Sequence, residues 1–407
     1  MQTNLADFIR DTPQGHEAEA ILRACVHCGF CTATCPTYQL LGDELDGPRG
    51  RIYLIKRVLE GEQPTRRTQL HLDRCLTCRN CESTCPSGVQ YGRLVDIGRK
   101  VVEEKVERPL GERILRGLLK ETLPRRALFS PAMKTGQALR GLLPQSLRNK
   151  VPQARESGAW PTAAHARRMV MLEGCVQPAM SPNINKATAR VFDALGIQLL
   201  RPGNAGCCGA IRYHLNDHEA GLDDARRNID AWWPLVEAGA EAILVNASGC
   251  GVMVKEYGQM LAMDPQYGAR AQRISLLARD VSEVLHAERE RLRALCKPGA
   301  APVAWHPPCT LQHGQKIRGL VEEVLAAVGV EARLCRDSHL CCGSAGTYSV
   351  LQEDISLQLR DDKLVKLDET GAEAIVSANI GCITHLQAGT GKAVSHWIEL
   401  IDRMLVR

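Results

Sequence analysis

The same cysteine pattern occurs twice in the first hundred residues of this chain, and no other feature limits its possible structure as strongly. Each copy has three cysteines separated by two residues, and then a fourth cysteine that is followed directly by proline. The eight residues are Cys25, Cys28, Cys31, Cys35, Cys75, Cys78, Cys81 and Cys85. This spacing is typical of the ligands of bacterial-type [4Fe–4S] clusters. The pattern predicts two [4Fe–4S] clusters and, because a close pair of one-electron centres conducts electrons, a function in electron transfer.

The order of the cysteines also predicts which thiolates bind which cluster. The three closely spaced cysteines of a motif can surround one cluster, whereas the Cys-Pro thiolate reaches the cluster of the other motif. The expected ligands are Cys25, Cys28, Cys31 and Cys85 for the first cluster, and Cys75, Cys78, Cys81 and Cys35 for the second. Zinc is a weak alternative, since structural zinc sites commonly use two separated Cys-x2-Cys pairs. Arg74 and Arg79 lie in or beside the second motif and would raise the cluster potential, unless they are simply solvated.

Length and composition limit the remaining classes of function. A chain of 407 residues suggests two or three domains, and its 18 cysteines indicate metal binding rather than disulfides. The net charge of +5 is too small to indicate nucleic acid as a partner, and no base-reading motif is present. The first residues lack the features of a signal peptide, and no apolar run is long enough to cross a bilayer. We therefore expect a protein of the cytosol or of the cytosolic membrane surface.

Residues 1–100 are expected to form a helical domain around the two motifs. Apolar residues at helical spacing predict a helix over residues 52–59, and helices are also expected over residues 17–24 and 91–106. A basic helical linker over residues 101–167 is expected next, because residues 100–168 contain fifteen Lys or Arg against six Glu and no Asp. Two interpretations of this linker remain open, a solvated basic face and a docking surface for a partner subunit or anionic lipid.

The rest of the chain contains an internal repeat with a spacing of 132 to 134 residues. Cys175, Cys207, Cys208 and Cys250 of the first copy recur as Cys309, Cys341, Cys342 and Cys382 of the second. The segment Gly-Ala-Glu-Ala-Ile also occurs in both copies, starting at Gly239 and at Gly371. We assign the first repeat to residues 168–295 and the second to residues 296–407.

Each repeat is expected to alternate strands and helices. The predicted strands are residues 169–172, 197–200, 242–245, 303–305, 330–334 and 374–377, and the predicted helices are residues 183–195, 217–238, 315–328 and 349–369. Such units favour parallel sheets with sites at the carboxyl ends of the strands, where the four cysteines of each repeat would converge. The expected fold class is α+β multidomain, with an N-terminal α-helical two-cluster ferredoxin-type domain and a C-terminal pair of α/β repeats.

The segments Cys207-Cys208-Gly209 and Cys341-Cys342-Gly343 resemble those of the cysteine-rich CCG domain family, whose paired repeats occur in heterodisulfide reductases and related proteins. In that family the motif closes with Cys-x-x-Cys, and the resemblance implies an unusual cluster in each repeat. This chain has Met253 and His385 at the closing position, so each repeat lacks one ligand. Two alternatives stay open, a metal or cluster site in which His306 or His385 substitutes, and a metal-free thiol site.

The complete layout of two cluster motifs, a basic linker and two CCG repeats resembles the iron–sulfur subunits of bacterial glycolate oxidases over essentially the whole chain. This resemblance implies a complex with flavin-containing dehydrogenase subunits that oxidise glycolate to glyoxylate. Electrons would pass through this chain toward the quinone pool, with the chain peripheral on the cytoplasmic face of the inner membrane. No flavin or nicotinamide fingerprint and no nucleophile–base constellation occurs, so we expect no catalytic residue and no binding of the hydroxy acid here.

Other interpretations share most of these features. The iron–sulfur subunits of lactate-utilisation and anaerobic glycerol-3-phosphate dehydrogenase complexes are similar, and the choice of substrate would be a property of the partner. A thiol or disulfide reductase acting at the Cys-Cys-Gly site is a second alternative, and the missing ligands count against it. A third is a non-enzymatic scaffold that senses redox state.

Overall fold

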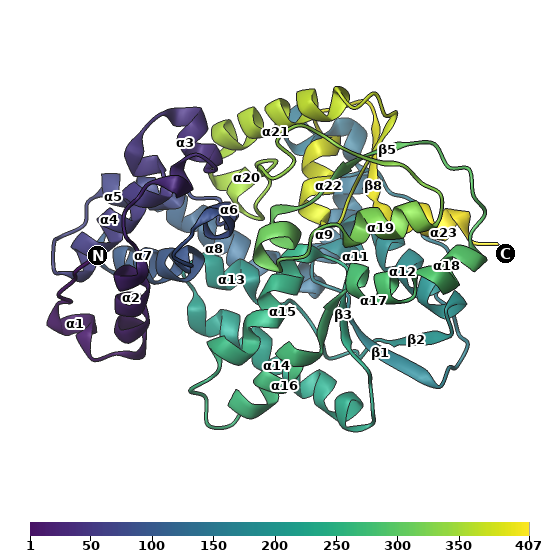
Figure 1. The fold of residues 1–407 in the computed structure, drawn as a ribbon, viewed down its shortest axis with the longest axis horizontal. Coiled ribbons are helices and arrows are strands. Elements are labelled where there is room, and N and C mark those ends of the chain that lie inside the picture. Colours follow the sequence, from purple (N-terminus) through teal and green to yellow (C-terminus); the bar gives the residue numbers. More distant parts are fainter. Residues whose placement is uncertain (407) are drawn as a thin grey trace. The chain divides into compact units, whose positions relative to one another are not determined.

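The computed structural model describes residues 1–406, apart from the side chains of Ser146 and Leu147. The chain forms two compact units. The first contains Met1–Gly117 and His339–Arg360, and the second contains Leu118–Ser338 and the residues from Asp361 onward. Figure 1 shows the ribbon with its elements labelled and coloured along the sequence.

The first unit is helical, as the sequence predicts. Its helices are α1 (Asp7–Arg10), α2 (Pro13–Ala24), α3 (Pro36–Leu41), α4 (Pro48–Leu59), α5 (Arg66–Asp73), α6 (Asn80–Thr84), α7 (Tyr91–Lys105), the first part of α8 (Leu110–Thr122), α20 (Tyr348–Leu351) and the first part of α21 (Glu353–Asp368). The predicted helices 17–24, 52–59 and 91–106 correspond to α2, α4 and α7. Helices α2, α3 and α4 each begin with proline, which suits a first helical position whose N–H has no partner within the helix.

An aliphatic core holds these helices together. Leu22 of α2, Ile55 and Leu59 of α4 and Leu94 of α7 are completely buried in it. Cys25, Cys75 and Cys81 belong to the same core cluster, so the motif loops are anchored on packed helices. Close approach depends on Gly98, since a Cβ there would lie 2.6 Å from the side chain of Ile55.

The second unit contains two parallel four-stranded sheets with the same strand order. The first sheet has the order β2-β1-β3-β4, formed by β1 (Arg167–Leu172), β2 (Ile197–Leu200), β3 (Ile243–Val245) and β4 (Ala278–Asp280). The second has the order β6-β5-β7-β8, formed by β5 (Val303–His306), β6 (Ala332–Leu334), β7 (Ala374–Ser377) and β8 (Ala393–His396). This match confirms the internal repeat.

Helices connect and cover the strands. Those of the first repeat are α11 (Gln177–Met180), α12 (Pro182–Ala194), α13 (Ala210–His214), α14 (His218–Glu237), α15 (Ser248–Met260), α16 (Gly268–Leu277), α17 (Val281–Ala287) and α18 (Arg289–Leu295). The second repeat adds α19 (Leu320–Ala327), the remainder of α21, α22 (Ile380–Gln387) and α23 (Trp397–Met404). In Figure 1, α14 and α16 lie on one side of the first sheet and α12 on the other.

The predicted strands all form, but each repeat contains one strand more than predicted. Strands β4 and β8 extend the two sheets and were not predicted. The helix predicted over residues 315–328 begins only at Leu320, because Gly319 adopts φ 79° and one turn of π-helix precedes it at Thr310–Gly314. The left-handed conformation of Gly319 ends the preceding turn and lets α19 start in a new direction.

The two repeats are joined by hydrogen bonds near the carboxyl ends of their central strands. The amide of Ser248 donates to the carbonyl of Ala378 at 3.1 Å, and the Ser248 hydroxyl lies 2.7 Å from that of Thr310. His396 Nε2 lies 2.9 Å from the carbonyl of Asn246. These contacts fix the site-bearing edges of both sheets within one unit.

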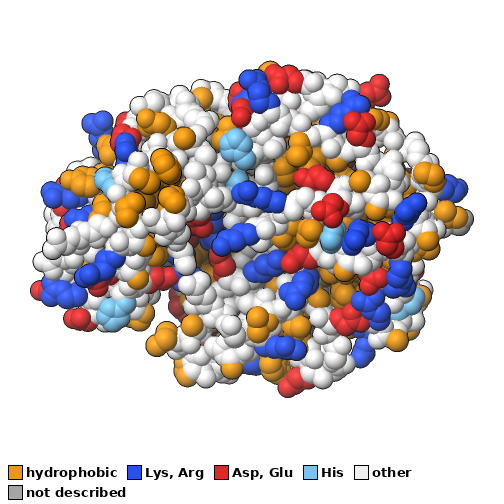
Figure 2. All heavy atoms as spheres, in the orientation of Figure 1, with side chains coloured by type: hydrophobic (Ala, Val, Ile, Leu, Met, Phe, Trp, Pro, Cys, Tyr) orange, Lys and Arg blue, Asp and Glu red, His pale blue; other side chains and the backbone are white. Residues whose placement is uncertain are grey.

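The segment between the motifs and the repeats is helical, as predicted, only as far as Arg148, whereas residues 152–165 form neither helix nor strand. It contains α8, α9 (Arg126–Ala138) and α10 (Gln145–Arg148). Apolar side chains of α8 face outward, with Ile114 54% and Leu118 56% exposed. On the face shown in Figure 2, hydrophobic side chains also gather over the N-terminal helices. None of the helices among the described residues is long and apolar enough to cross a membrane.

Candidate metal centres

The cysteines of the first hundred residues line two cavities in the first unit. Cys25, Cys28, Cys31 and Cys85 line the first, which has about 440 Å³ of empty space, part of it open to solvent. Cys35, Cys75, Cys78 and Cys81 line the second, with about 300 Å³. Each fourth cysteine therefore lies with the three cysteines of the other motif. Cys81, Pro48 and Tyr91 line both cavities, so the two cavities are neighbours.

Left-handed turns bring three thiols of each motif to one side. His27 and Gly29 in the first motif have φ of 59° and 87°, and Thr77 and Arg79 in the second have φ of 52° and 58°. A left-handed residue costs roughly 1–2 kcal/mol unless it is glycine, so three of these four positions store backbone strain. At Gly29 a side chain has no room either, because a Cβ would lie 2.6 Å from Arg49 Nη1.

The chemistry of the two cavities fits clusters. Burial raises the pKa of Cys31 to about 11, with further repulsion from Cys25, and burial with repulsion from Cys78 and Cys75 raises that of Cys81. Four thiolates in one place repel each other, and a bound iron centre would remove this penalty because a coordinating thiol is deprotonated. The Thr77 amide donates to Cys75 Sγ at 3.3 Å, a contact of the kind that stabilises cluster sulfur.

The motifs differ in exposure. Among the cysteines that line only the first cavity, Cys28 is exposed, whereas Cys35, Cys75 and Cys81, which line the second cavity, are buried. Two exposed apolar side chains, Val26 and Phe30, line the first cavity beside Cys28. The first cavity therefore lies nearer to solvent than the second.

Two cations cap equivalent carbonyl groups of the two motifs. The amino group of Met1 donates to the carbonyls of Leu22 at 3.0 Å and Cys25 at 2.6 Å. In the second motif, Arg99 Nη2 donates to the carbonyls of Leu72 at 2.8 Å and Cys75 at 2.6 Å. Leu72 and Cys75 each lie fifty residues after their counterparts in the first motif. Each cation fixes the turn that leads from a helix into the first cysteine of a motif.

A buried carboxylate ties the motifs together. Asp46 is fully buried and accepts hydrogen bonds from Arg74 at 2.8 Å and Arg51 at 3.4 Å, and lies 3.0 Å from His71 Nδ1. Its carbonyl accepts from the Thr37 hydroxyl, which lies 3.3 Å from Cys35 Sγ. Burial lowers the pKa of Arg51, but attraction to Cys75 and the other acidic groups outweighs it and raises that pKa. The second cavity thus has a rigid, charged wall.

In the first repeat the four cysteines converge, as the strand-end placement predicts. Cys175 and Cys208 lie close enough to Cys207, and Cys250 close enough to Cys208, for each thiol to affect the pKa of its neighbours. Cys175 and Cys208 lower the pKa of Cys207 well below its usual value, although burial opposes them. The pKa of Cys175 rises in turn, through its interaction with Cys207 and then through burial. Met253 lies beside this group, 3.3 Å from the position of a Cβ on Gly209.

In the second repeat, His306 and Cys382 come together. A ring nitrogen of His306 and Sγ of Cys382 lie within 4.8 Å of each other. His306 is buried and neither ring nitrogen has a hydrogen-bond partner. Burial, followed by repulsion from Lys363, lowers its pKa to about 3. Cys309 lies at the start of the π-helical turn in the same unit, whereas Cys341 and Cys342 belong to the His339–Arg360 segment of the first unit.

Fold and sites together define an iron–sulfur protein with a pair of cysteine-rich domains. A family model described as a 4Fe-4S dicluster domain matches residues 21–89, and one described as a cysteine-rich domain matches residues 169–255 and 303–387. A glycolate oxidase iron-sulfur subunit of Escherichia coli (strain K12) is 57% identical over 406 residues, which are 100% of this chain and 99% of that protein. The chain belongs to the family of glycolate oxidase iron–sulfur subunits.

More distant relatives agree with this placement. A probable glycolate oxidase iron-sulfur subunit of Bacillus subtilis (strain 168) is 30% identical, over 91% of this chain and 89% of that protein. Lactate utilization protein A of Bacillus pumilus (strain SAFR-032) is 27% identical, over 52% of this chain and 87% of its own length. The similarity to lactate-utilisation proteins therefore covers about half of this chain.

The structure adds residues that the sequence interpretation missed. The sequence suggested Arg74 and Arg79, which lie in or beside the second motif, as the cations that affect its cluster. The cations buried beside this motif are instead Arg51 and Arg99. Arg99 carries a charge among the apolar residues on the buried face of α7, and Arg51 does the same on α4. A charged residue on an apolar helix face is the signal that could have identified both.

Proposed function

We propose that each cavity of the first unit holds one [4Fe–4S] cluster. Cys25, Cys28, Cys31 and Cys85 would bind the first cluster, and Cys75, Cys78, Cys81 and Cys35 the second. The observation that carries this proposal is the crossing of the fourth cysteines, since bacterial two-cluster proteins exchange this ligand between motifs. When bound, the clusters supply one-electron transfer. The lining residues that the two cavities share would keep the centres close enough for rapid transfer.

We further propose that the chain is the electron-transfer subunit of a flavin-linked glycolate oxidase complex. Oxidation of glycolate to glyoxylate releases two electrons and two protons, which a flavin on a partner subunit can accept together. This chain would take the electrons one at a time and pass them toward a quinone. The family supports this role.

Co-purification of the affinity-tagged full chain tests this function. We expect a flavoprotein to accompany the chain, and glycolate to bleach the visible absorbance of the clusters in the complex. The double variant Cys28→Ser/Cys78→Ser is the matched control, because it should keep the partner and lose the response. Reduction by lactate or glycerol 3-phosphate instead of glycolate would assign the chain to one of the related complexes. Purification without any flavoprotein would contradict the proposed role.

The chain would act at the cytoplasmic face of the inner membrane as a peripheral protein. Support comes from α8, where Leu110, Ile114 and Leu118 are exposed within a basic stretch of the sequence. Basic amphipathic helices bind anionic lipid or acidic partner surfaces. We expect binding to anionic vesicles to weaken several-fold between 0.1 and 1 M salt, because the Debye length falls to roughly 3 Å. Neutralising Arg125, Arg126 and Arg140 together should mimic high salt, and unchanged binding would exclude an electrostatic role.

A thiol or disulfide reductase at the first repeat is the alternative that the lowered pKa of Cys207 favours. Cys207 is fully buried, however, and Cys175 and Cys208 are buried with it. A disulfide substrate could reach Cys207 only if this core opened. Turnover of a model disulfide by the isolated chain would favour the alternative, and we expect none.

A further inference from the structure

Arg99 stands out because its charge is buried without a carboxylate acceptor. Its side chain belongs to α7, and the residue is only 8% exposed. Its hydrogen bonds go to the carbonyls of Leu72 and Cys75 and to Thr77 Oγ1, at 2.6 to 3.1 Å. All of these acceptors are neutral, so the positive charge of the guanidinium is not cancelled by its own partners. Both Cys75 and Thr77 belong to the second cluster motif.

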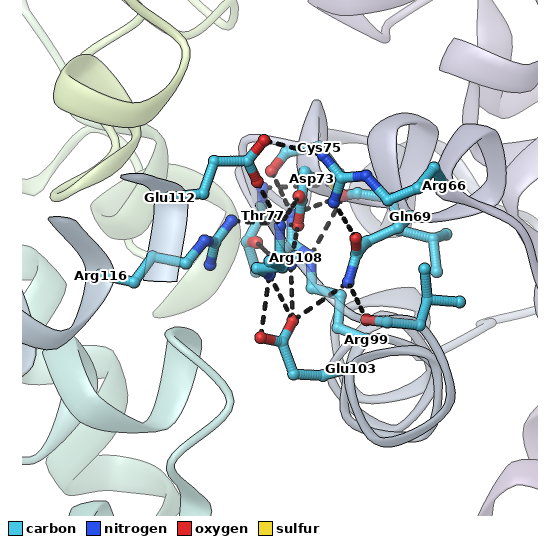
Figure 3. A network of polar contacts seen from close by, with 12 residues as sticks. Arg66, Gln69, Asp73, Cys75, Thr77, Arg99, Glu103, Arg108, Glu112 and Arg116 are labelled. Atoms are coloured by element: carbon cyan, nitrogen blue, oxygen red, sulfur yellow. Dashed lines mark hydrogen bonds and ion pairs between the residues drawn. The ribbon is translucent and has the colours of Figure 1, made fainter. Parts of the chain in front are cut away.

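Nearby carboxylates are engaged by other arginines. Figure 3 shows Arg108 at the centre of a network in which it bonds Asp73 at 2.6 Å and Glu103 at 2.6 Å. Arg116 also pairs with Asp73 at 3.2 Å, and Arg66 pairs with Glu112 at 2.7 Å. Although burial opposes it, the hydrogen bond from Arg108 lowers the pKa of Asp73, so this carboxyl is ionised. Four guanidinium groups face three carboxylates, and Arg99 is the one nearest to the motif.

The charges beside the first cavity are less buried. Arg49 lies beside Gly29, but its side chain is 36% exposed and pairs with Glu44 at 2.6 Å. The amino group of Met1 caps the same carbonyl groups there, and Met1 is only partly buried. Solvent and counter-ions screen exposed charges far more than buried ones. Beside the second motif, two guanidinium groups, those of Arg51 and Arg99, are buried with the carboxylate of Asp46, so we expect the field at the second cavity to be the more positive of the two.

We propose that Arg99 is a positioning residue that raises the reduction potential of the second cluster above that of the first. This inference rests on the proposed function. A reduced cluster carries one more negative charge than an oxidised one, so a buried cation favours the reduced form. Arg99 also holds Thr77, whose amide donates to Cys75 Sγ at 3.3 Å and adds a stabilising dipole. Arg51 is also buried in the wall of the second cavity, but it pairs with the buried carboxylate of Asp46, so we expect a smaller contribution from it.

The order of potentials would give transfer a direction. An electron supplied by the reduced flavin of the proposed partner would enter where Cys28 is exposed and come to rest at the end buried by Arg99. Each event moves one electron, and no bond of the chain forms or breaks. The second electron would then find the low-potential end free again. The chain could thus separate the two electrons of the flavin between two centres.

A redox titration of the full chain, followed by electron paramagnetic resonance, tests the proposal. The signal of the second cluster is identified as the one that Cys78→Ser removes. In Arg99→Gln we expect the reduced-to-oxidised ratio of the second cluster to fall about tenfold at fixed potential, which is 59 mV for one electron. Arg99→Lys keeps the charge and should change the ratio less than threefold. Arg57→Gln, which removes an exposed guanidinium on α4, is the matched control and should change neither cluster.

Several outcomes would overturn the inference. They are an unchanged second cluster in Arg99→Gln, an equal shift of both clusters, and a first cluster with the higher potential in the native chain. If Arg99→Gln does not assemble, Thr77→Val removes one acceptor of the guanidinium and should lower the same ratio two- to threefold. No change in Thr77→Val would then contradict the proposal. A native chain without two cluster signals would instead contradict the proposed function itself.

Discussion

The cysteines of the two motifs and those of the first repeat have the same side chain in opposite surroundings. In the motifs, five thiols line the first cavity and four line the second, with Cys81 shared, and space remains between them. In the first repeat, Cys175, Cys207 and Cys208 are buried so close together that each thiol shifts the pKa of its neighbours. A cysteine-rich site is thus defined less by the number of its thiols than by what occupies the space between them. The comparison makes three predictions.

The largest effect should come from the motif cysteines. We expect the native chain to contain about eight iron atoms, and Cys28→Ser or Cys78→Ser to contain about four. Cys35→Ser should damage the second cluster although it belongs to the first motif, because its thiol lines the second cavity. Iron analysis and visible absorbance provide the measurement. Cys335→Ser is the control, since this buried cysteine lies outside both groups and should retain all eight.

Retention of both clusters in Cys28→Ser would contradict the ligand sets. Loss of the first cluster, rather than the second, in Cys35→Ser would show that the fourth cysteine does not cross.

A smaller effect, on stability alone, is expected from the first repeat. Cys207→Ala removes a fully buried side chain from the core of the first repeat and leaves a small cavity, so we expect about 1–3 kcal/mol lower stability of the second unit. Tryptophan fluorescence during urea unfolding measures this, since Trp160, Trp232, Trp233, Trp305 and Trp397 all belong to that unit. Iron should stay at about eight atoms. A loss of iron in Cys207→Ala would show that this repeat also holds metal.

The smallest effect at neutral pH is expected at His306 of the second repeat. His306→Leu removes two buried nitrogens that have no partner, so stability at pH 7 should change by less than about 1 kcal/mol. The difference should appear in acid. Because the pKa of His306 is about 3 in the fold, the unfolded chain takes up its proton first as the pH falls below the usual pKa of 6.5. Native stability then falls by up to about 1.4 kcal/mol per pH unit until pH 3, and the variant should lack this loss.

Urea unfolding at pH 7 and at pH 5, again followed by tryptophan fluorescence, provides the measurement. Equal pH dependence in the native chain and in His306→Leu would show that His306 is not held neutral. A loss of several kcal/mol at pH 7 would show that His306 has a partner, such as a metal shared with Cys382.

Local patterns in the sequence predicted the parts of this molecule whose causes are local. Cysteine spacing grouped the eight motif cysteines, periodicity located α4, and the alternating elements of the internal repeat located the central strands of both sheets. Strands β4 and β8 were missed because they are short edge strands with mixed residues, such as Ala278-Arg279-Asp280. Such strands form because a neighbouring strand offers free hydrogen-bonding groups. Their own sequences have no regular alternation of apolar and polar residues from which the strands could be predicted.

Long-range contacts escaped prediction for a different reason. The Tyr348 hydroxyl donates to the carbonyl of Arg74 at 3.1 Å, across 274 residues of sequence. Arg99 similarly donates to the carbonyl of Cys75 from α7. The sequence predicted this helix, but it did not predict the role of the buried arginine. Single residues that join distant segments leave no repeating signal, so only the folded chain shows them.

The discontinuity of the first unit has a consequence for how the protein is made. Met1–Gly117 leave the ribosome early, but His339–Arg360 complete this unit only when about nine-tenths of the chain has been synthesised. Until then Asn80 lacks the carbonyl of His339 and Arg74 lacks the hydroxyl of Tyr348. The N-terminal segment of the nascent chain therefore lacks these contacts with residues 339–360 until both sheets have been largely translated. We expect the motif cysteines to be more accessible during this period than in the folded chain, so that iron and sulfide could reach them before the unit closes.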